Sequence, residues 1–146
     1  MSVSGVFERV EYPNGLMITF STGMVNVDKA CDVVMGYLKG NVPQAGPHLF
    51  AINLAMREGL TNAVRHGNRY DPETLIFLRM SLESRNMVVL TIQDQGKGFS
   101  WQEADACIPD DGSDHGRGLA IMRAYCTDYS FNQKGNILTL KKKLSS

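Results

Sequence analysis

The sequence has no excess charge of either sign. Fifteen lysines and arginines are balanced by fifteen aspartates and glutamates, so the formal net charge is zero. A nucleic-acid-binding domain normally carries a basic surface that supplies much of its affinity for phosphates. The balance therefore argues against direct nucleic-acid binding. The basic run Lys141-Lys142-Lys143 is better explained as the solvated end of a terminal strand than as a phosphate or membrane patch.

Cysteines and long apolar runs are also scarce. The three cysteines, Cys31, Cys107 and Cys126, are far apart and form no C-x-x-C pair. This usage favours reduced thiols in the cytoplasm over a disulfide framework or a zinc site. Residues 1–5 lack the basic and apolar regions of a signal peptide, and the richest apolar stretch, 49–56, is too short to span a bilayer. We therefore expect a cytoplasmic protein without membrane contact.

The 146 residues are enough for one domain with a substantial core, and no repeat, linker or low-complexity segment divides them. We expect a single domain over residues 1–146. Apolar spacing predicts strands joined mainly as hairpins, with helices grouped between them, which is typical of an α+β two-layer sandwich. The predicted strands are 6–10, 16–21, 74–83, 87–93, 129–131 and 136–144. Three helices are predicted: the first begins with Asn26 as its N-cap, the second runs from Pro47 to His66, and the third runs from Leu119 to Tyr125.

The second predicted helix carries a polar stripe. Glu58, Asn62 and His66 are four residues apart, so they lie on one face of a helix. The Asn62 carbonyl oxygen suits Mg²⁺, which prefers oxygen ligands and takes few of them from the protein when phosphates supply the rest. Glu58 suits a general base that accepts the proton of an attacking hydroxyl. The alternative is a solvated polar face, with His66 capping the helix end.

A carboxylate and two glycines follow the fourth predicted strand, in the segment 94–99. The ionised Asp94 only accepts hydrogen bonds, so it matches the exocyclic amine of adenine and repels the carbonyl oxygen of guanine. Gly96 and Gly98 allow unusual backbone angles and close approach to a base or ribose. The alternative is an ordinary turn, where Asp and Gly are common.

A long irregular segment, Ser100 to His115, precedes Gly116-Arg117-Gly118 and the last predicted helix. Such a segment inside a compact domain is usually functional or disordered. Exposed N–H groups at the helix start suit phosphate, and Arg117 adds positive charge. The alternative is a simple helix-start turn.

The three motifs, in this order, resemble the N, G1 and G2 boxes of the GHKL (Bergerat-fold) ATP-binding superfamily, and in particular its small bacterial anti-sigma-factor branch of serine-protein kinases. The resemblance covers about residues 27–144. It implies a mixed, mostly antiparallel sheet with helices on one face and an ATP lid at 100–115. The sequence departs from the family at Gly135-Asn136-Ile137, where members often carry Gly-Thr, although Thr139 lies close by.

The resemblance implies a serine/threonine-protein kinase that uses ATP and Mg²⁺ and acts as an anti-sigma factor. Its partners would be a sigma factor, which it sequesters, and an anti-anti-sigma antagonist, on which it phosphorylates a serine; a homodimer is also implied. The alternatives are an ATP-binding partner-switch module without kinase activity and a stand-alone ATPase. The implied site residues are Glu58 as catalytic base, Asn62 as metal ligand, and Asn62, His66, Asp94, Gly96, Gly98, Phe99, Gly116, Arg117, Gly118 and Leu119 around the nucleotide.

Overall fold

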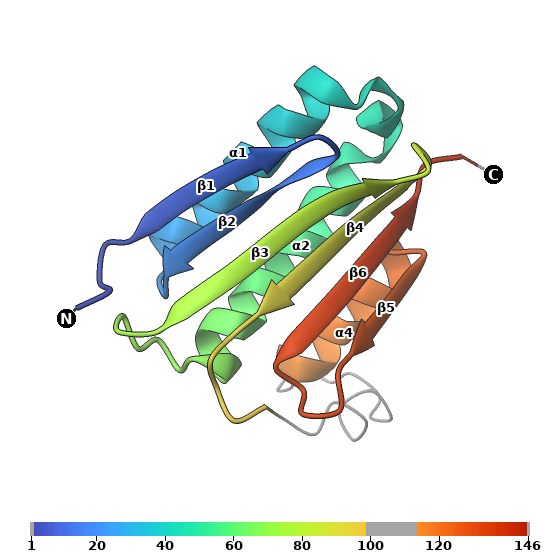
Figure 1. Ribbon diagram of the computed structural model, residues 1–146. Coiled ribbons are helices and arrows are strands. Elements are labelled where there is room, and N and C mark those ends of the chain that lie inside the picture. The colour runs from blue at the N-terminus through green and yellow to red at the C-terminus, as the bar shows by residue number, and fades with distance from the viewer. Residues whose placement is uncertain (1, 99–113, 146) are drawn as a thin grey trace.

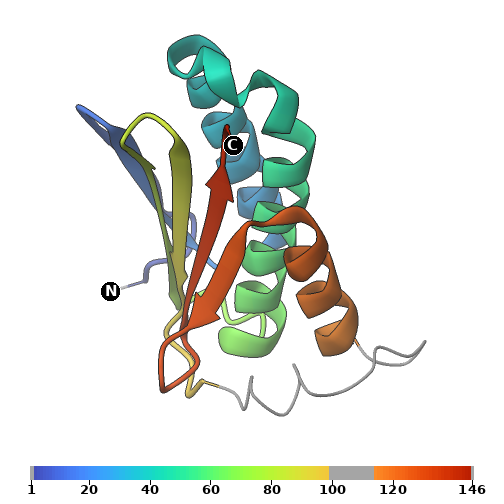
Figure 2. The same cartoon turned by 90° about the vertical axis from the view of Figure 1, so that its right-hand side faces the viewer.

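The computed structural model describes residues 2–98 and 114–145, which form two layers: a six-stranded sheet and helices on one of its faces (Figures 1 and 2). The α+β two-layer architecture is therefore confirmed. None of the helices in these two segments is long and apolar enough to cross a membrane. The elements are β1 (Phe7–Tyr12), β2 (Gly15–Ser21), α1 (Met24–Asn41), a 3₁₀ turn (Pro43–His48), α2 (Leu49–Asn62), a π-helical turn (Ala63–Gly67), β3 (Leu75–Glu83), β4 (Met87–Gln93), α4 (Asp114–Tyr125), β5 (Asp128–Phe131) and β6 (Ile137–Lys143).

The strand order is β1-β2-β3-β4-β6-β5, and every described pair is antiparallel. The resemblance implies a mixed sheet, but no parallel pair occurs among the described strands. Three pairs, β1–β2, β3–β4 and β5–β6, are neighbours in sequence, as the hairpin pattern predicts. The β6 strand lies between β4 and β5, so the end of the chain completes the sheet beside the strand that carries Asp94 at its end (Figure 1).

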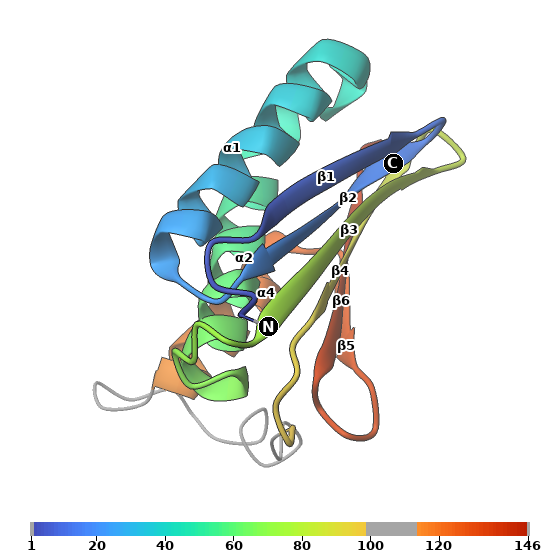
Figure 3. The same ribbon diagram turned by 60° about the vertical axis from the view of Figure 1, so that its left-hand side comes forward.

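The core lies between the sheet and the helices α1, α2 and α4, which share one face of it (Figure 3). Alternate residues of each inner strand point into this layer, as expected from the period of two in a strand. Fully burying one such side chain contributes about 1.5–3 kcal/mol. The buried residues include Leu16, Ile18 and Phe20 on β2; Ile76, Leu78 and Met80 on β3; Val88, Leu90 and Ile92 on β4; and Val27, Ala30, Cys31, Val34 and Leu38 on α1.

The start of α1 differs from the prediction. The helix begins at Met24, and the preceding Gly23 makes no side-chain cap. Asn26 is therefore not the N-cap; it lies within the first turn, where its Nδ2 donates to the Ser21 carbonyl oxygen at 2.8 Å. Its amide ties the helix to the end of β2 instead of satisfying the helix's own N–H groups.

The second helix is divided into three segments. Pro47 does not open α2: it lies in the 3₁₀ turn, and α2 begins at Leu49. At the other end the chain continues into the π-helical turn, where the Asn68 N–H donates to the Ala63 carbonyl at 2.8 Å. The predicted helix end near His66 is therefore correct, but its last turn is wider than an α-helical turn.

The third helix starts earlier than predicted. It begins at Asp114, so Gly116-Arg117-Gly118 lies inside its first turns rather than before them. The helix packs against α2 on the side of the polar stripe (Figure 2). Of the predicted lid, residues 100–113 lie outside the described residues, and so does Phe99.

Candidate functional site

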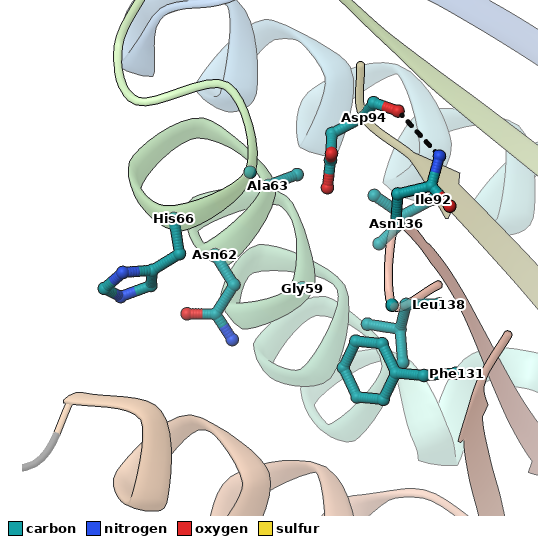
Figure 4. Close-up of a pocket in the computed structure, with 11 residues that line it drawn as sticks. Gly59, Asn62, Ala63, His66, Ile92, Asp94, Phe131, Asn136 and Leu138 are labelled. Atoms are coloured by element: carbon teal, nitrogen blue, oxygen red, sulfur yellow. Dashed lines mark hydrogen bonds between the residues drawn. The ribbon is translucent and has the colours of Figure 1, made fainter. Parts of the chain in front are cut away.

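A cavity lies between the C-terminal half of α2, with its π-helical turn, and the adjoining ends of β4 and β6 (Figure 4). Its wall combines apolar side chains with a few polar groups that come from separate elements. This composition is typical of sites that bind small molecules or cofactors. The apolar lining residues are Ala63, Ile92, Phe131 and Leu138, the polar ones are Asn62, His66, Asp94 and Asn136, and Gly59, Gly67 and Gly135 complete the wall.

Gly59 sets how closely α2 approaches the sheet. A Cβ at this position would lie 2.7 Å from Ile92 Cδ1 and 3.0 Å from Leu138 Cδ2. A larger residue would have to displace these side-chain ends, so Gly59 acts as a packing glycine between α2 and the sheet. The close approach also places the polar stripe of α2 beside the cavity.

Asp94 follows β4 directly, and its side chain enters the cavity (Figure 4). It is only 8% exposed. Its Oδ1 accepts the Gly96 N–H at 2.8 Å, whereas its Oδ2 accepts no hydrogen bond from any residue in the described segments. Burial raises the pKa of Asp94, and the Gly96 N–H and the nearby Lys134 ammonium partly offset that rise. The site therefore holds a carboxylate with an unused acceptor oxygen.

Glycine backbones pack against this carboxylate. A Cβ on Gly67 would lie 2.3 Å from Asp94 Cγ, and one on Gly96 would lie 2.1 Å from the Gly67 carbonyl oxygen. Gly98 has a φ of 85° and packs against the Lys134 carbonyl, 1.8 Å from where a Cβ would be. Gly96 and Gly98 do make close contacts, but these contacts are with backbone atoms of the protein, and close approach to a base or ribose stays a prediction. In the sequence alone, Gly67 is indistinguishable from an ordinary glycine that closes a helix.

Side-chain amides fix the loop that follows α2. The Asn68 Nδ2 donates to the Leu75 carbonyl at 2.9 Å and to Thr22 Oγ1 at 2.8 Å, and its Oδ1 accepts the Gln95 N–H at 2.8 Å. The Gln95 Oε1 in turn accepts the Leu75 N–H at 2.7 Å. The same loop walls a second, open groove that shares His66 and Gly67 with the cavity. Neither amide belongs to the three sequence motifs that predict the site.

The first and third motifs meet where α4 crosses α2. A Cβ on Gly118 would lie 3.0 Å from Asn62 Nδ2 and 3.5 Å from Glu58 Oε2. The absence of a side chain there lets the α4 backbone approach the polar stripe. Glu58 Oε2 and both side-chain amide atoms of Asn62 therefore lie close to a glycine of a second helix. His66, one turn further on, lines the cavity.

Other predicted site residues lie elsewhere. Leu119 is 2% exposed and belongs to the core, so its role at a nucleotide stays a prediction. Phosphate binding by Gly116, Arg117 and Gly118 stays a prediction as well.

Of the two polar residues at the start of the last strand, Thr139 and Asn136, only Asn136 lines the cavity. Thr139 lies between the buried Leu138 and Leu140, so it points to the opposite face of the sheet. Asn136, at the position where family members often have threonine, lines the cavity instead.

Comparison with known proteins gives three findings. The chain matches the histidine kinase-like ATPase domain family over residues 20–142. It is 26% identical over 95 residues to the anti-sigma F factor of Heyndrickxia coagulans, a match that covers 60% of this chain and 65% of that protein. It superposes with a TM-score of 0.51 on the histidine kinase domain of the blue-light activated histidine kinase from Erythrobacter litoralis EL346, at 16% identity, covering 82% of this chain and 60% of the other. The chain thus spans less than two thirds of either protein, and the second likeness concerns the fold alone.

Proposed function

Because the chain belongs to the histidine kinase-like ATPase domain family, we propose that it binds ATP in the cavity between α2, β4 and β6 and transfers the γ-phosphate to a protein serine or threonine. The observation that carries the proposal is the buried Asp94, whose Oδ2 is unused at one end of an apolar cavity. The exocyclic amine of adenine would donate to this oxygen. Ile92, Leu138 and Phe131 offer apolar surface to the flat ring.

The polar stripe fits the phosphates and their metal ion. Mg²⁺ usually takes one or two oxygen ligands from the protein and the rest from phosphates and water. The Asn62 carbonyl is the proposed ligand, because it is an uncharged oxygen donor beside the α4 backbone at Gly118. When bound, Mg²⁺ would neutralise part of the phosphate charge. His66 lines the same cavity and is placed to donate to a phosphate oxygen.

Glu58 is the proposed general base. Its carboxylate lies on the same face of α2 as Asn62 and next to Gly118, the region in which the phosphates would lie. There it would accept the proton of the attacking hydroxyl while that oxygen bonds to the γ-phosphorus, the bond from that phosphorus to the bridging oxygen breaks, and ADP leaves. General-base assistance of this kind contributes about 10²–10⁴-fold to the rate.

The relative named anti-sigma F factor supports a regulatory role. We propose that the protein acts in the cytoplasm as an anti-sigma factor, binds a sigma factor, and phosphorylates a serine of an anti-anti-sigma antagonist, with a homodimer as its working form. The alternatives are a partner-switch module that uses ATP without turnover and a stand-alone ATPase that transfers phosphate to water. They differ in whether phosphate reaches a protein, water or nothing.

Substituting Glu58 by glutamine separates these functions. Glu58→Gln keeps the shape of the side chain but removes the base, so it should bind Mg-ATP nearly as the wild type does and lose phosphotransfer by about 10²–10⁴-fold. The measurement is transfer of labelled γ-phosphate from Mg-ATP to candidate antagonist proteins, together with phosphate release. The same change at the exposed Glu83, at the far end of β3, is the matched control and should have no effect.

Each outcome selects one function. Label on an antagonist protein supports the kinase, and phosphate release without labelled protein supports the ATPase. If the wild type binds ATP and a verified partner but neither labels that partner nor releases phosphate, the kinase proposal is wrong and the partner-switch module replaces it.

A further inference from the structure

The backbone of Asp94 is held by an unusual end to the β4–β6 ladder. In a hydrogen-bonded antiparallel pair, two opposite residues exchange both N–H···O=C bonds. At the end of this ladder the Asp94 N–H donates to the Asn136 carbonyl at 3.0 Å. The Asn136 N–H is diverted to Asn132 Oδ1, also at 3.0 Å. The reciprocal bond is made by the Asn136 side chain, whose Nδ2 donates to the Asp94 carbonyl at 3.3 Å (Figure 4).

The direction of these bonds is set by backbone groups at both ends. The Asn132 Oδ1 accepts the N–H groups of Gly135, Asn136 and Ile137 at 2.9, 3.0 and 3.0 Å. Its Nδ2 is therefore the group that faces Asn136, and it donates to Asn136 Oδ1 at 2.8 Å. With Oδ1 engaged, Nδ2 of Asn136 is the atom left to meet the Asp94 carbonyl. Neither amide could turn over without opposing two donors or two acceptors.

We propose that Asn132 and Asn136 act as positioning residues that hold Asp94 for base recognition and so set the preference for adenine over guanine nucleotides. The inference rests on the proposed function. The Asp94 carboxylate is joined to its backbone by only two rotatable bonds, so an anchored carbonyl and N–H fix where Oδ2 points. A small displacement would misalign the hydrogen bond that distinguishes an amine from a carbonyl on the base.

Asparagine suits this role, and the threonine common in the family does not. A threonine hydroxyl is one bond shorter than the asparagine amide and would not reach both Asn132 Nδ2 and the Asp94 carbonyl. At position 136 this chain thus uses a residue that acts through Asp94. Thr139 faces away from the cavity and offers no substitute.

The substitution Asn132→Asp tests this relay, the chain of hydrogen bonds that runs from Asn132 through the Asn136 amide to the Asp94 carbonyl. The carboxylate still accepts the three backbone N–H groups, so the turn is kept, but it presents an acceptor to Asn136 in place of a donor. The Asn136 amide must then turn its Nδ2 toward position 132, which leaves two oxygens facing each other at Asp94. Calorimetric Kd values for ATP and GTP should show the ATP preference reduced by about three- to tenfold, the equivalent of one hydrogen bond.

Gln133→Glu is the matched control, because it adds the same charge to the same turn at an exposed side chain. It should leave the preference unchanged. Asn136→Thr removes the amide without adding charge, and it should reduce the preference as Asn132→Asp does. It also provides a second variant if Asn132→Asp does not fold. In an Asp94→Asn background, Asn132→Asp should have no further effect on selectivity, because the two changes act through one group.

The outcomes separate this inference from the proposed function. General damage to the fold would weaken ATP and GTP binding alike and leave their ratio intact, whereas the relay predicts a change in the ratio. Wild-type selectivity in both Asn132→Asp and Asn136→Thr, or an equal loss in Gln133→Glu, would overturn the inference while ATP binding stands. A wild-type protein that binds neither nucleotide would contradict the proposed function and the inference together.

Discussion

The two ends of the β3–β4 pair close in different ways. At one end the strands join through Ser84, Arg85 and Asn86, and the first two are in the left-handed region with φ of 52° and 58°, which is common in tight hairpin connections. Backbone groups complete this end: the Asn86 N–H donates to the Glu83 carbonyl at 3.0 Å, and the Leu144 N–H to the Asn86 carbonyl at 2.7 Å. One distant side chain also reaches the turn, because the Gln44 Nε2 donates to the Arg85 carbonyl at 3.0 Å.

At the opposite end the strands stop at the cavity, and side chains take the place of backbone partners. Amides of Asn68, Gln95 and Asn136 bond the ends of β3 and β4. Arg69 and Tyr70 also have left-handed backbone conformations, with φ of 51° and 62°. They lie in the loop between the π-helical turn and β3, not in a hairpin turn. The two ends therefore differ in degree. The turn end has its own backbone bonds and one amide from a distant residue, that of Gln44, whereas three amides, which can both donate and accept, hold the cavity end.

The largest expected effect comes from adding one methyl group at the site end. In Gly67→Ala the new Cβ would meet the Asp94 carboxylate at 2.3 Å, so the carboxylate or the π-helical turn must move. Overpacking of this kind costs about 1–3 kcal/mol of unfolding free energy. ATP affinity should fall about a hundredfold, roughly 2.7 kcal/mol, because the base-reading group is displaced. Calorimetry and thermal unfolding measure the two effects.

The matched control adds the same methyl group away from the site. Gly36 lies inside α1 with no heavy atom within 4 Å of its Cβ position, so Gly36→Ala should stabilise the protein by about 0.5–1 kcal/mol. A Gly67→Ala variant that binds ATP as the wild type does would show that the glycine contacts around Asp94 do not matter for binding.

A smaller loss is expected when the carboxylate itself is changed. Asp94→Asn keeps an acceptor for the Gly96 N–H but replaces the unused oxygen by an amide that also donates. ATP binding should weaken by about 1.5–3 kcal/mol, the value of a hydrogen bond to a charged group, and discrimination against GTP should relax. Competition binding with both nucleotides measures this. A wild-type protein that binds GTP as tightly as ATP would contradict the assignment.

The same substitution should stabilise the protein without ligand. Burial raises the pKa of Asp94 in the folded state, so ionising this residue costs more there than in the unfolded chain. The penalty is absent below the ordinary aspartate pKa, grows as the pH rises through the raised pKa, and is constant above it. Asp94→Asn should therefore raise Tm at pH 7, and this gain should disappear at acidic pH. The exposed Asp128→Asn controls for the loss of one charge.

The smallest effect is expected at the turn end. Arg85 has a Cβ, so its left-handed backbone conformation is sterically unfavourable. Arg85→Gly removes this steric cost but raises the conformational entropy of the unfolded chain, which offsets part of the gain. We expect a net gain of about 0.5–1 kcal/mol in unfolding free energy, measured by denaturant titration, with ATP affinity unchanged. Altered nucleotide binding in this variant would show that the two ends of the sheet are not independent.

The fold was largely predictable because its strongest signals are local. Apolar residues that recur every two positions predicted the strands, and those that recur every three to four positions predicted the helices. The errors fall where a side chain or helix end has a distant partner. Asn26 looks like a cap in sequence, but its amide bonds the end of β2. The first turn of α4 lies within a segment read as lid.

The candidate site was predictable in part for the same reason. Helical spacing brought Glu58, Asn62 and His66 together, and the end of a strand placed Asp94 beside them. Asn68 and Asn136 were not recognised as site residues, because their partners lie 46 and 42 residues away in the chain. An amide in a turn sequence gives no local sign of which distant backbone group it will meet.

Those separations have a consequence for folding cooperativity. The Asp94–Asn136 pair closes a segment of 42 residues, and the Asn68–Thr22 bond closes one of 46, so neither forms before distant parts of the chain have come together. The cavity therefore exists only in the fully assembled fold, and a ligand bound there has no comparable site in partly folded chains. A nucleotide at one hundred times its Kd would add about 2.7 kcal/mol to the stability of the whole domain.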